Sequence, residues 1–237
     1  MADDVFHNIL NALKQNNKIE RLSFAKNEMN RMICSSTLKL TRSQNQMVRL
    51  CLAHCEITDE GMSIINNGLE NTNIRYLNIS WNNLTPVSME SLANFVSSNQ
   101  YLEKLLIQHN EFGSSELKDL GKALAKHKSV KYLDVSANGI QAEGFITLMQ
   151  MIASSEIPLH TFQCRKNEID GTKVHNGLFE KLHQSTYLHV LNLRGNQFLN
   201  DTALEMTKYC EQNVYIEEIG LSGNNKIHSP EIEEIEN

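Results

Sequence analysis

Apolar residues recur along this chain at uneven but repeating intervals. In the stretch 102–112, Leu102, Leu105 and Ile107 are followed by Asn110 and Phe112, so apolar residues occupy positions i, i+3, i+5 and i+10 and asparagine occupies i+8. The segments that start at 74, 130 and 188 fill these positions in the same way. Weaker copies start at 19, 47, 159 and 216, so the chain contains eight copies of one pattern.

The copies begin 27–29 residues apart, which leaves room for a strand and a helix in each period. Positions i+3 and i+5 point to one side of an extended segment, which predicts a short half-buried strand in every copy. The second half of several periods is amphipathic at helical spacing, which predicts helices. We expect helices at 4–15, 61–69, 88–96, 144–152 and 202–210, and a distorted helix at 31–44, where the apolar stripe is poorer.

Several of these helices are preceded by the small polar residues or proline that begin helices. The pairs are Thr58 with Asp59, Thr85 with Pro86, Ser114 with Ser115, and Asp201 with Thr202. Stacked repeats of a strand and a helix predict an α/β solenoid with a parallel sheet of about eight short strands. Because helices are wider than strands, the stack should curve with the sheet on the concave face and the helices on the convex face.

The pattern predicts one domain over residues 1–237. Residues 1–18 form an N-terminal capping helix, residues 19–227 form the eight repeats, and residues 228–237 form an acidic tail that contains Pro230. The tail has no helical second half, so it either folds over the last strand or leads into further chain.

The asparagine at i+8 recurs where the chain leaves each strand and turns. An amide side chain can both donate and accept hydrogen bonds there, and so satisfy backbone groups of neighbouring turns that would otherwise be buried without a partner. Cys55 takes this position in the copy that starts at 47. We therefore interpret the asparagine column as structural rather than catalytic.

A fixed period with the pattern L-x-x-L-x-L-x-x-N/C-x-L is the leucine-rich repeat signature. Over about residues 4–227 the chain resembles the ribonuclease inhibitor-like class of leucine-rich repeat proteins. That class includes ribonuclease inhibitor, Ran GTPase-activating proteins, the sensor domains of NOD-like receptors and the actin-binding ends of tropomodulins. The resemblance implies a protein that binds another protein across the concave sheet and the loops that leave it.

Composition narrows the function further. The formal charge of −6 and the pI near 5.9 argue against general phosphate binding, so we expect no nucleic acid partner. The N-terminal residues are acidic where a signal peptide needs basic ones, and no apolar run approaches membrane-spanning length, so we expect no membrane insertion. The five cysteines are scattered and odd in number, which favours reduced thiols and a cytoplasmic location.

Residues at i+2, i+4 and i+6 should face the concave side, and residue i+7 should stand at the strand exit. Two groups on these columns are candidates for partner binding. The first is aromatic and apolar, has the composition of a binding hot spot, and consists of Tyr76, Trp81, Leu106, His109 and Tyr132. The second is a basic patch of Arg165, Lys166 and Arg194, which suits an acidic partner segment. The alternatives are that Trp81 folds over its own turn and that the basic row is merely solvated.

Catalytic interpretations find little support in the sequence. Cys51, His54 and Cys55 could form a thiol–imidazole pair or part of a metal site, but Cys55 is an interior position and the group has no third member. His109 and Asp134 lie on adjacent predicted strands without a nucleophile in register. We therefore predict a monomeric, non-catalytic scaffold without a cofactor, whose partner is another protein. The alternatives are a regulator of a small GTPase, as in Ran GTPase-activating proteins, and an actin-binding module, as in tropomodulins.

Overall fold

The computed structural model describes residues 2–154, 157–174, 177–180 and 185–224. One sheet of eight parallel strands runs through it in chain order. The strands are β1 (Arg21–Ser23), β2 (Arg49–Cys51), β3 (Tyr76–Asn78), β4 (Lys104–Leu106), β5 (Tyr132–Asp134), β6 (Thr161–Gln163), β7 (Val190–Asn192) and β8 (Glu218–Gly220). The predicted strand register is confirmed, because equivalent positions such as Leu77, Leu105 and Leu133 are paired across the sheet. Ile227 and the predicted tail at 228–237 lie outside the described residues.

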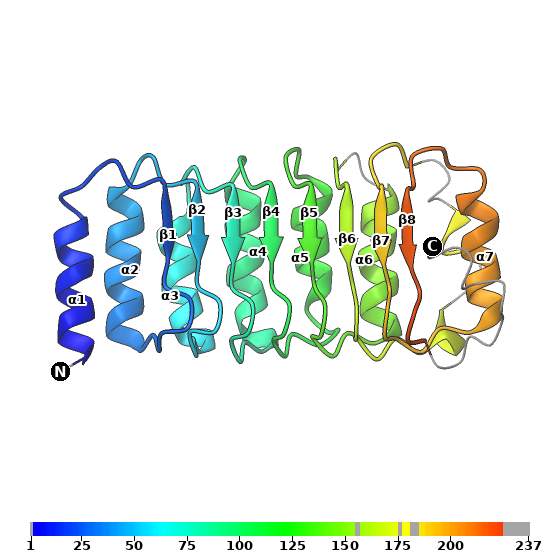
Figure 1. Ribbon diagram of the computed structural model, residues 1–237, viewed down its shortest axis with the longest axis horizontal. Coiled ribbons are helices and arrows are strands. Elements are labelled where there is room, and N and C mark those ends of the chain that lie inside the picture. The colour runs from blue at the N-terminus through cyan, green and yellow to red at the C-terminus, as the bar shows by residue number, and fades with distance from the viewer. Residues whose placement is uncertain (1, 155–156, 175–176, 181–184, 225–237) are drawn as a thin grey trace.

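The helices form a second layer, and Figure 1 shows the strands standing side by side in front of them. They are α1 (Ala2–Leu13), α2 (Arg31–Ser43), α3 (Asp59–Leu69), α4 (Met89–Ser98), α5 (Leu117–Ala125), α6 (Ala142–Ser154) and α7 (Asn200–Cys210), with the 3-10 helices η1 (Pro86–Ser88) and η2 (Gly171–Lys173). Each of the helices α1 to α5 packs on the next helix along the stack, and α6 packs on η2. The predicted α/β solenoid, with its sheet on the concave face and its helices on the convex face, is confirmed.

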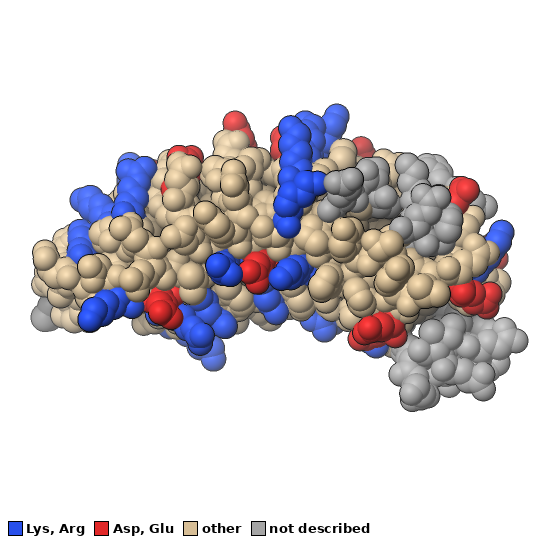
Figure 2. Space-filling model, turned by 90° about the horizontal axis from the view of Figure 1, so that it is seen from above, with Lys and Arg blue, Asp and Glu red and all other residues tan. Residues whose placement is uncertain are grey.

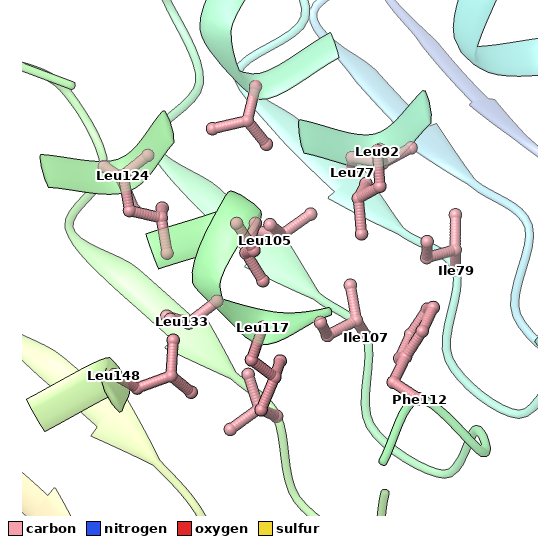
Figure 3. Packing of buried hydrophobic residues seen from close by; sticks show 14 of the residues in the cluster. Leu77, Ile79, Leu92, Leu105, Ile107, Phe112, Leu117, Leu124, Leu133 and Leu148 are labelled. Atoms are coloured by element: carbon pink, nitrogen blue, oxygen red, sulfur yellow. The ribbon is translucent and has the colours of Figure 1, made fainter. Parts of the chain in front are cut away.

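The hydrophobic core lies between the two layers. Leu105 of β4 and Leu133 of β5 are fully buried, and so are Leu117 and Leu120 of α5. Figure 3 shows side chains of β4 and β5 pointing toward those of α5 and α6. At the two ends of the described sheet the equivalent strand residues, Leu22 and Ile219, are only partly buried, because β1 and β8 each pair with a strand on one side only within the described residues.

The prediction of a distorted helix at 31–44 is wrong. Helix α2 is a regular α-helix whose N-cap, Asn30, accepts a hydrogen bond from the backbone N–H of Ile33. Its buried face includes hydroxyl groups, which a count of apolar residues overlooks. Thr37 donates to the carbonyl of Ile33 at 2.9 Å and Thr41 donates to that of Leu38 at 2.9 Å, so these polar groups are buried with their bonds made within the helix.

The predicted helix starts are confirmed at α3 and η1. Thr58 caps α3 by accepting from the N–H of Gly61, and Thr85 caps η1, which begins with Pro86. The other two predicted starts are wrong, since α5 has Glu116 and α7 has Leu199 at the N-cap, without a capping side-chain hydrogen bond. In the period that starts at 159, the described residues of the second half contain η2 and no α-helix.

The asparagine column binds consecutive repeats together, as predicted. Asn110 donates from Nδ2 to the carbonyls of Ile79 and Ile107 (3.1 and 2.9 Å), and its Oδ1 accepts from the N–H groups of Asn82 and Leu84 (3.1 and 3.2 Å). The same pattern recurs at Asn82, Asn167, Asn196 and Asn224. In each, Nδ2 donates to a carbonyl of the preceding repeat and Oδ1 accepts from a backbone N–H in the turn of that repeat.

Three positions of the column depart from this pattern, and Asn27 in the first copy is one of them, since its amide bonds only within its own turn. In the second copy the Cys55 thiol donates to the carbonyl of Phe24 at 3.1 Å, so cysteine supplies the donor without the amide acceptor. At Asn138 the Oδ1 atom has no partner among the described residues, and Gly113 N–H donates instead to the Asn138 main-chain carbonyl.

Replacing Asn110 with alanine should lower the free energy of unfolding by about 1–3 kcal/mol, because buried backbone groups of two adjacent repeats lose their partners. Asn27→Ala is the matched control. Asn27 is exposed, and its amide donates to the carbonyls of Phe24 and Ala25 in its own turn (3.0 and 3.2 Å). Its replacement should cost less than about 1 kcal/mol. Urea unfolding measures both losses, and equal losses would show that the bonds between repeats contribute nothing.

A second ladder follows the opposite edge of the sheet, where helices lead into strands. The Nε2 atom of His127 bonds the carbonyl of Asn99 at 2.7 Å, and its Nδ1 accepts from the N–H of Ser129 at 3.2 Å. Because a backbone N–H can only donate, the ring is neutral and carries its proton on Nε2. One repeat earlier, Asn99 makes the same two kinds of bond, to the carbonyl of Thr72 and from the N–H of Tyr101. Burial lowers the pKa of His127, against the smaller raising effect of the Asn99 carbonyl.

A histidine whose pKa is lowered by folding contributes stability that is complete above its unfolded pKa of about 6.5 and is lost as pH falls below it. Replacing His127 with asparagine should keep both hydrogen bonds, as at Asn99, and remove the titration. The melting temperature of His127→Asn relative to the unmodified chain should therefore rise between about pH 7.5 and about pH 5.5. A difference that does not change with pH would contradict the buried neutral ring.

Candidate functional site

A column of left-handed residues marks the edge where the chain leaves the sheet. In each repeat the residue at i+7 has a positive φ: Lys26 (65°), His54 (55°), Trp81 (58°), His109 (55°), Ala137 (51°), Lys166 (53°), Gly195 (70°) and Gly223 (72°). This conformation is uncommon for residues other than glycine and asparagine, and it costs energy for a bulky side chain. We call these residues the exit column. Its second to fourth members carry large aromatic rings, although glycine would adopt this conformation at a lower energy.

The rings of three consecutive exit-column residues form one stack. Trp81 lies between His54 and His109, with ring centroids 4.7 Å and 3.5 Å away and interplanar angles of 12° on both sides. The indole is 46% exposed, so the stack stands in solvent rather than in the core. Trp81 thus lies against the rings of the neighbouring repeats and not over its own turn. From the sequence, His54 is considered only as a catalytic candidate beside the cysteines and is not included in the aromatic group. Its distance of 27 residues from Trp81, one repeat period, could have indicated that the two are neighbours.

The surroundings of His109 lower its pKa and so favour its neutral form. Partial burial is the main cause that lowers the pKa of His109, and the positive charges of Lys166 and Arg165 lower it further. The carboxylate of Asp134 acts in the opposite direction but is the weaker influence. A neutral imidazole can stack closely on the indole without repelling the cations next to it.

A row of alternating cations and tyrosines crosses the sheet beside the stack, at position i+2. The register pairs Arg49 with Tyr76, Tyr76 with Lys104, and Lys104 with Tyr132. The Arg49 guanidinium carbon lies 3.9 Å from the Tyr76 ring centroid, and Lys104 Nζ lies 3.6 Å from that of Tyr132. Cation–π contacts of this kind hold each charge over one face of a ring. We call these four residues the cation–tyrosine row.

Burial also shifts the pKa values in this row. It lowers the pKa of Lys104, while Asp134 raises that pKa and Arg49 lowers it. Burial raises the pKa of Tyr132, with a further contribution from Asp134. Asp134 is only 3% exposed, and one of its carboxylate oxygens accepts from the N–H of Ser136 at 3.0 Å. A buried carboxylate therefore lies close to Lys104 and Tyr132 near the centre of the sheet.

Leu106 lies on the concave side, as its position predicts, but offers little surface because it is only 7% exposed. It is paired in register with Asn78 and Asp134. The accessible surface of the predicted aromatic and apolar group therefore comes from Trp81 and His109, which stack on each other, and from Tyr76 and Tyr132, which contact cations.

The predicted basic patch is split. Arg165 and Lys166 are exposed and lie close enough to His109 to affect its pKa. Arg194 instead pairs with Glu218 at 3.0 Å, and its Nε donates to Ser222 Oγ at 3.1 Å. A half-exposed ion pair of this kind adds little stability, but it neutralises part of the patch.

The cysteines do not form a reactive group. Burial raises the pKa of Cys55, and it raises the pKa of Cys34 to about 11 and that of Cys164 to about 12. High values favour the thiol over the nucleophilic thiolate. Within the described ranges, no group of three or more histidine, cysteine, aspartate or glutamate side chains could hold a metal ion. None of the helices in that part of the chain is long and apolar enough to cross a membrane.

Comparison with known proteins agrees with the repeat period and the solenoid. The leucine rich repeat family model matches residues 44–65, 70–93, 126–149 and 184–206. The chain is a leucine-rich repeat protein. Each matched segment contains a strand, its exit turn and the beginning of the helix that follows.

Two relatives show how far the likeness extends. The leucine-rich repeat chain is 23% identical over 124 residues to mouse (Mus musculus) NACHT, LRR and PYD domains-containing protein 4B, and the match covers 52% of this chain but 14% of that protein. Among solved structures it is similar to Leiomodin-1 Actin-Binding Site 2, with a TM-score of 0.53 and 14% identity over 63% of this chain and 88% of that one. At this identity the structural likeness shows the fold alone.

Because the rings stack, Trp81 fluorescence should report the protonation of the neighbouring imidazoles. A protonated imidazole quenches an adjacent indole more than a neutral one does. Because the pKa of His109 is lowered, quenching should develop below about pH 6.5. Replacing His109 with glutamine should remove the larger part of this transition. His160→Gln is the control, since the lowered pKa of His160 belongs to a ring that packs on His189. A transition that survives unchanged in His109→Gln would contradict the stack.

Proposed function

We propose that this leucine-rich repeat protein is a non-catalytic binding module whose partner protein binds across the concave sheet and its exit column. The observation that carries the proposal is the half-exposed Trp81 stacked between His54 and His109. A large ring held by two neighbours loses little side-chain entropy on binding, and tryptophan and tyrosine are enriched among residues that dominate binding energy. In this proposal Tyr132, Tyr76, Arg165 and Lys166 complete the contact surface.

Several features support a structural rather than catalytic use of the remaining polar groups. The asparagines at i+8, such as Asn110, use their hydrogen bonds on backbone groups of neighbouring repeats. Burial raises the pKa of Cys34, Cys55 and Cys164. In this proposal the chain acts as a monomer in the cytoplasm, where its five free cysteines would stay reduced. Leiomodin-1 Actin-Binding Site 2 shares the fold, so actin is one partner to include in a direct assay. GTPase regulation remains the other alternative for such an assay.

The proposal predicts that Trp81→Ala/Tyr132→Ala weakens partner binding roughly tenfold or more, because two central aromatic contacts are lost. The measurement is affinity capture from a cytosolic extract, followed by titration of the captured protein. Tyr101→Ala/Tyr187→Ala is the matched control. These tyrosines are 51% and 42% exposed, but each immediately precedes position i of its repeat and so lies outside the concave columns. Both variants should keep the melting temperature of the unmodified chain. Equal capture by all three proteins would overturn the assignment to the concave face.

A further inference from the structure

The concave positions and the rest of the chain carry charge of opposite sign. Positions i+2, i+4, i+6 and i+7 of the eight repeats hold seven basic residues and two acidic ones, a formal charge of +5 in a chain of −6. The remaining residues therefore carry −11. The basic residues are Arg21, Lys26, Arg49, Lys104, Arg165, Lys166 and Arg194, and the acidic ones are Asp134 and Glu218. On the edge of the molecule seen in Figure 2, in contrast, blue and red side chains are interspersed.

The two acidic residues offset only part of this positive charge. Asp134 is buried close enough to Lys104 to raise its pKa, and Glu218 is paired with Arg194 at 3.0 Å near the last strand. Arg49, Arg165 and Lys166 are exposed. Within the described part of the chain, none of these three makes an ion pair. Their charges remain available to a ligand.

Trp81 presents its edge rather than its faces, and Tyr76 and Tyr132 each have one face covered. Trp81 has an imidazole on each side, and one face of Tyr76 and of Tyr132 is covered by Arg49 and Lys104. An aromatic ring is negative on its faces and positive at its edge, and the indole N–H is a hydrogen-bond donor. Ring edges and fixed cations together form a surface suited to carboxylates.

We infer that the partner segment bound on the concave face is an acidic peptide chain, whose aspartate or glutamate side chains bind between the cation–tyrosine row and the Trp81 stack. This inference rests on the proposed function and adds the chemistry of the partner. The cations of Arg49 and Lys104 are held in place by their tyrosines, so a carboxylate meets charges that are already positioned.

Single-stranded nucleic acid is the other polyanion that a basic, aromatic surface can bind, and the geometry argues against it. Sequence-tolerant binding of that kind relies on bases stacking on aromatic faces. At Trp81 both faces are occupied by histidines. The charge of −11 over the rest of the chain would also repel a long polyphosphate that extends beyond the concave face. A short acidic peptide avoids that repulsion.

The test uses the intrinsic fluorescence of Trp81, the single tryptophan of the chain. The probe is a synthetic 12-residue peptide of alternating glutamate and glycine, titrated against the full chain. We expect saturable change in Trp81 emission, and weaker binding as salt rises, since screening shortens the reach of exposed charges. Arg49→Glu/Lys104→Glu should weaken binding roughly tenfold or more. Lys39→Glu/Lys118→Glu changes the net charge equally at exposed positions of α2 and α5 on the convex face, and should change binding less than about twofold.

Three outcomes would overturn the inference. These are no response to the peptide, equal loss in both charge-reversal variants, and binding of a 12-nucleotide oligo-dT as tight as that of the peptide. Failure of the proposed function looks different. If a captured partner is lost by Trp81→Ala/Tyr132→Ala but retained by Arg49→Glu/Lys104→Glu, the concave site stands and its acidic specificity is wrong. If both variants retain it, the site itself is wrong.

Discussion

The turn after each strand depends on the repeat that follows it. Where the chain leaves the sheet, main-chain N–H groups of most repeats are buried against the next repeat. They find their acceptor in an asparagine 25–29 residues further along, as Asn82 and Leu84 do in Asn110. Unpaired, each of these groups would cost about 1–3 kcal/mol. This requirement keeps the repeats in register, and the near-constant period of 27–29 residues follows from it. The apolar positions then fill the space that this register creates.

The same turn shapes the candidate binding surface. To place its asparagine, each repeat takes a left-handed conformation at the preceding residue. Because neighbouring repeats are in register, the side chains of that residue line up along one edge. Small or glycine residues there would leave a smooth edge, as at Gly195 and Gly223. Instead, the second to fourth repeats place His54, Trp81 and His109 there, and their rings stack at 12° to one another. The stack is thus a consequence of solenoid geometry combined with an energetically unfavourable choice of residue.

The fold could be predicted from the sequence because the core obeys one spacing rule. Leu105, Ile107 and Phe112 are buried where the pattern places them, and all eight strands follow it. The prediction for residues 31–44 failed because buried polar groups there have hydrogen-bond partners, which a pattern of apolar residues cannot reveal. Helix α2 is regular because the hydroxyls of Thr37 and Thr41 bond to its own carbonyls.

The candidate site was only partly predictable, for a related reason. Its columns follow from the alternation of strand residues, which placed Trp81 and His109 on one edge. The contacts between columns depend on side-chain conformations, which the spacing does not determine. Arg49 over Tyr76, Arg194 on Glu218 and the burial of Leu106 all depend on which neighbour each side chain meets. His54 was missed because its sequence neighbours are cysteines, whereas its spatial neighbour is Trp81.

The concave columns are informative because the fold places few demands on them. Core positions must be apolar and the turn must carry an amide, so their residues reflect stability. Residues at i+2 can be polar, charged or small, and residues at i+7 need only adopt the left-handed conformation. The last repeat uses Glu218 and Gly223 at these positions. An excess of five positive charges on unconstrained positions, in a chain that is otherwise acidic, is not required by packing. Clustered like charges also repel one another and lower stability slightly, so such a surface is best explained by a ligand that compensates them.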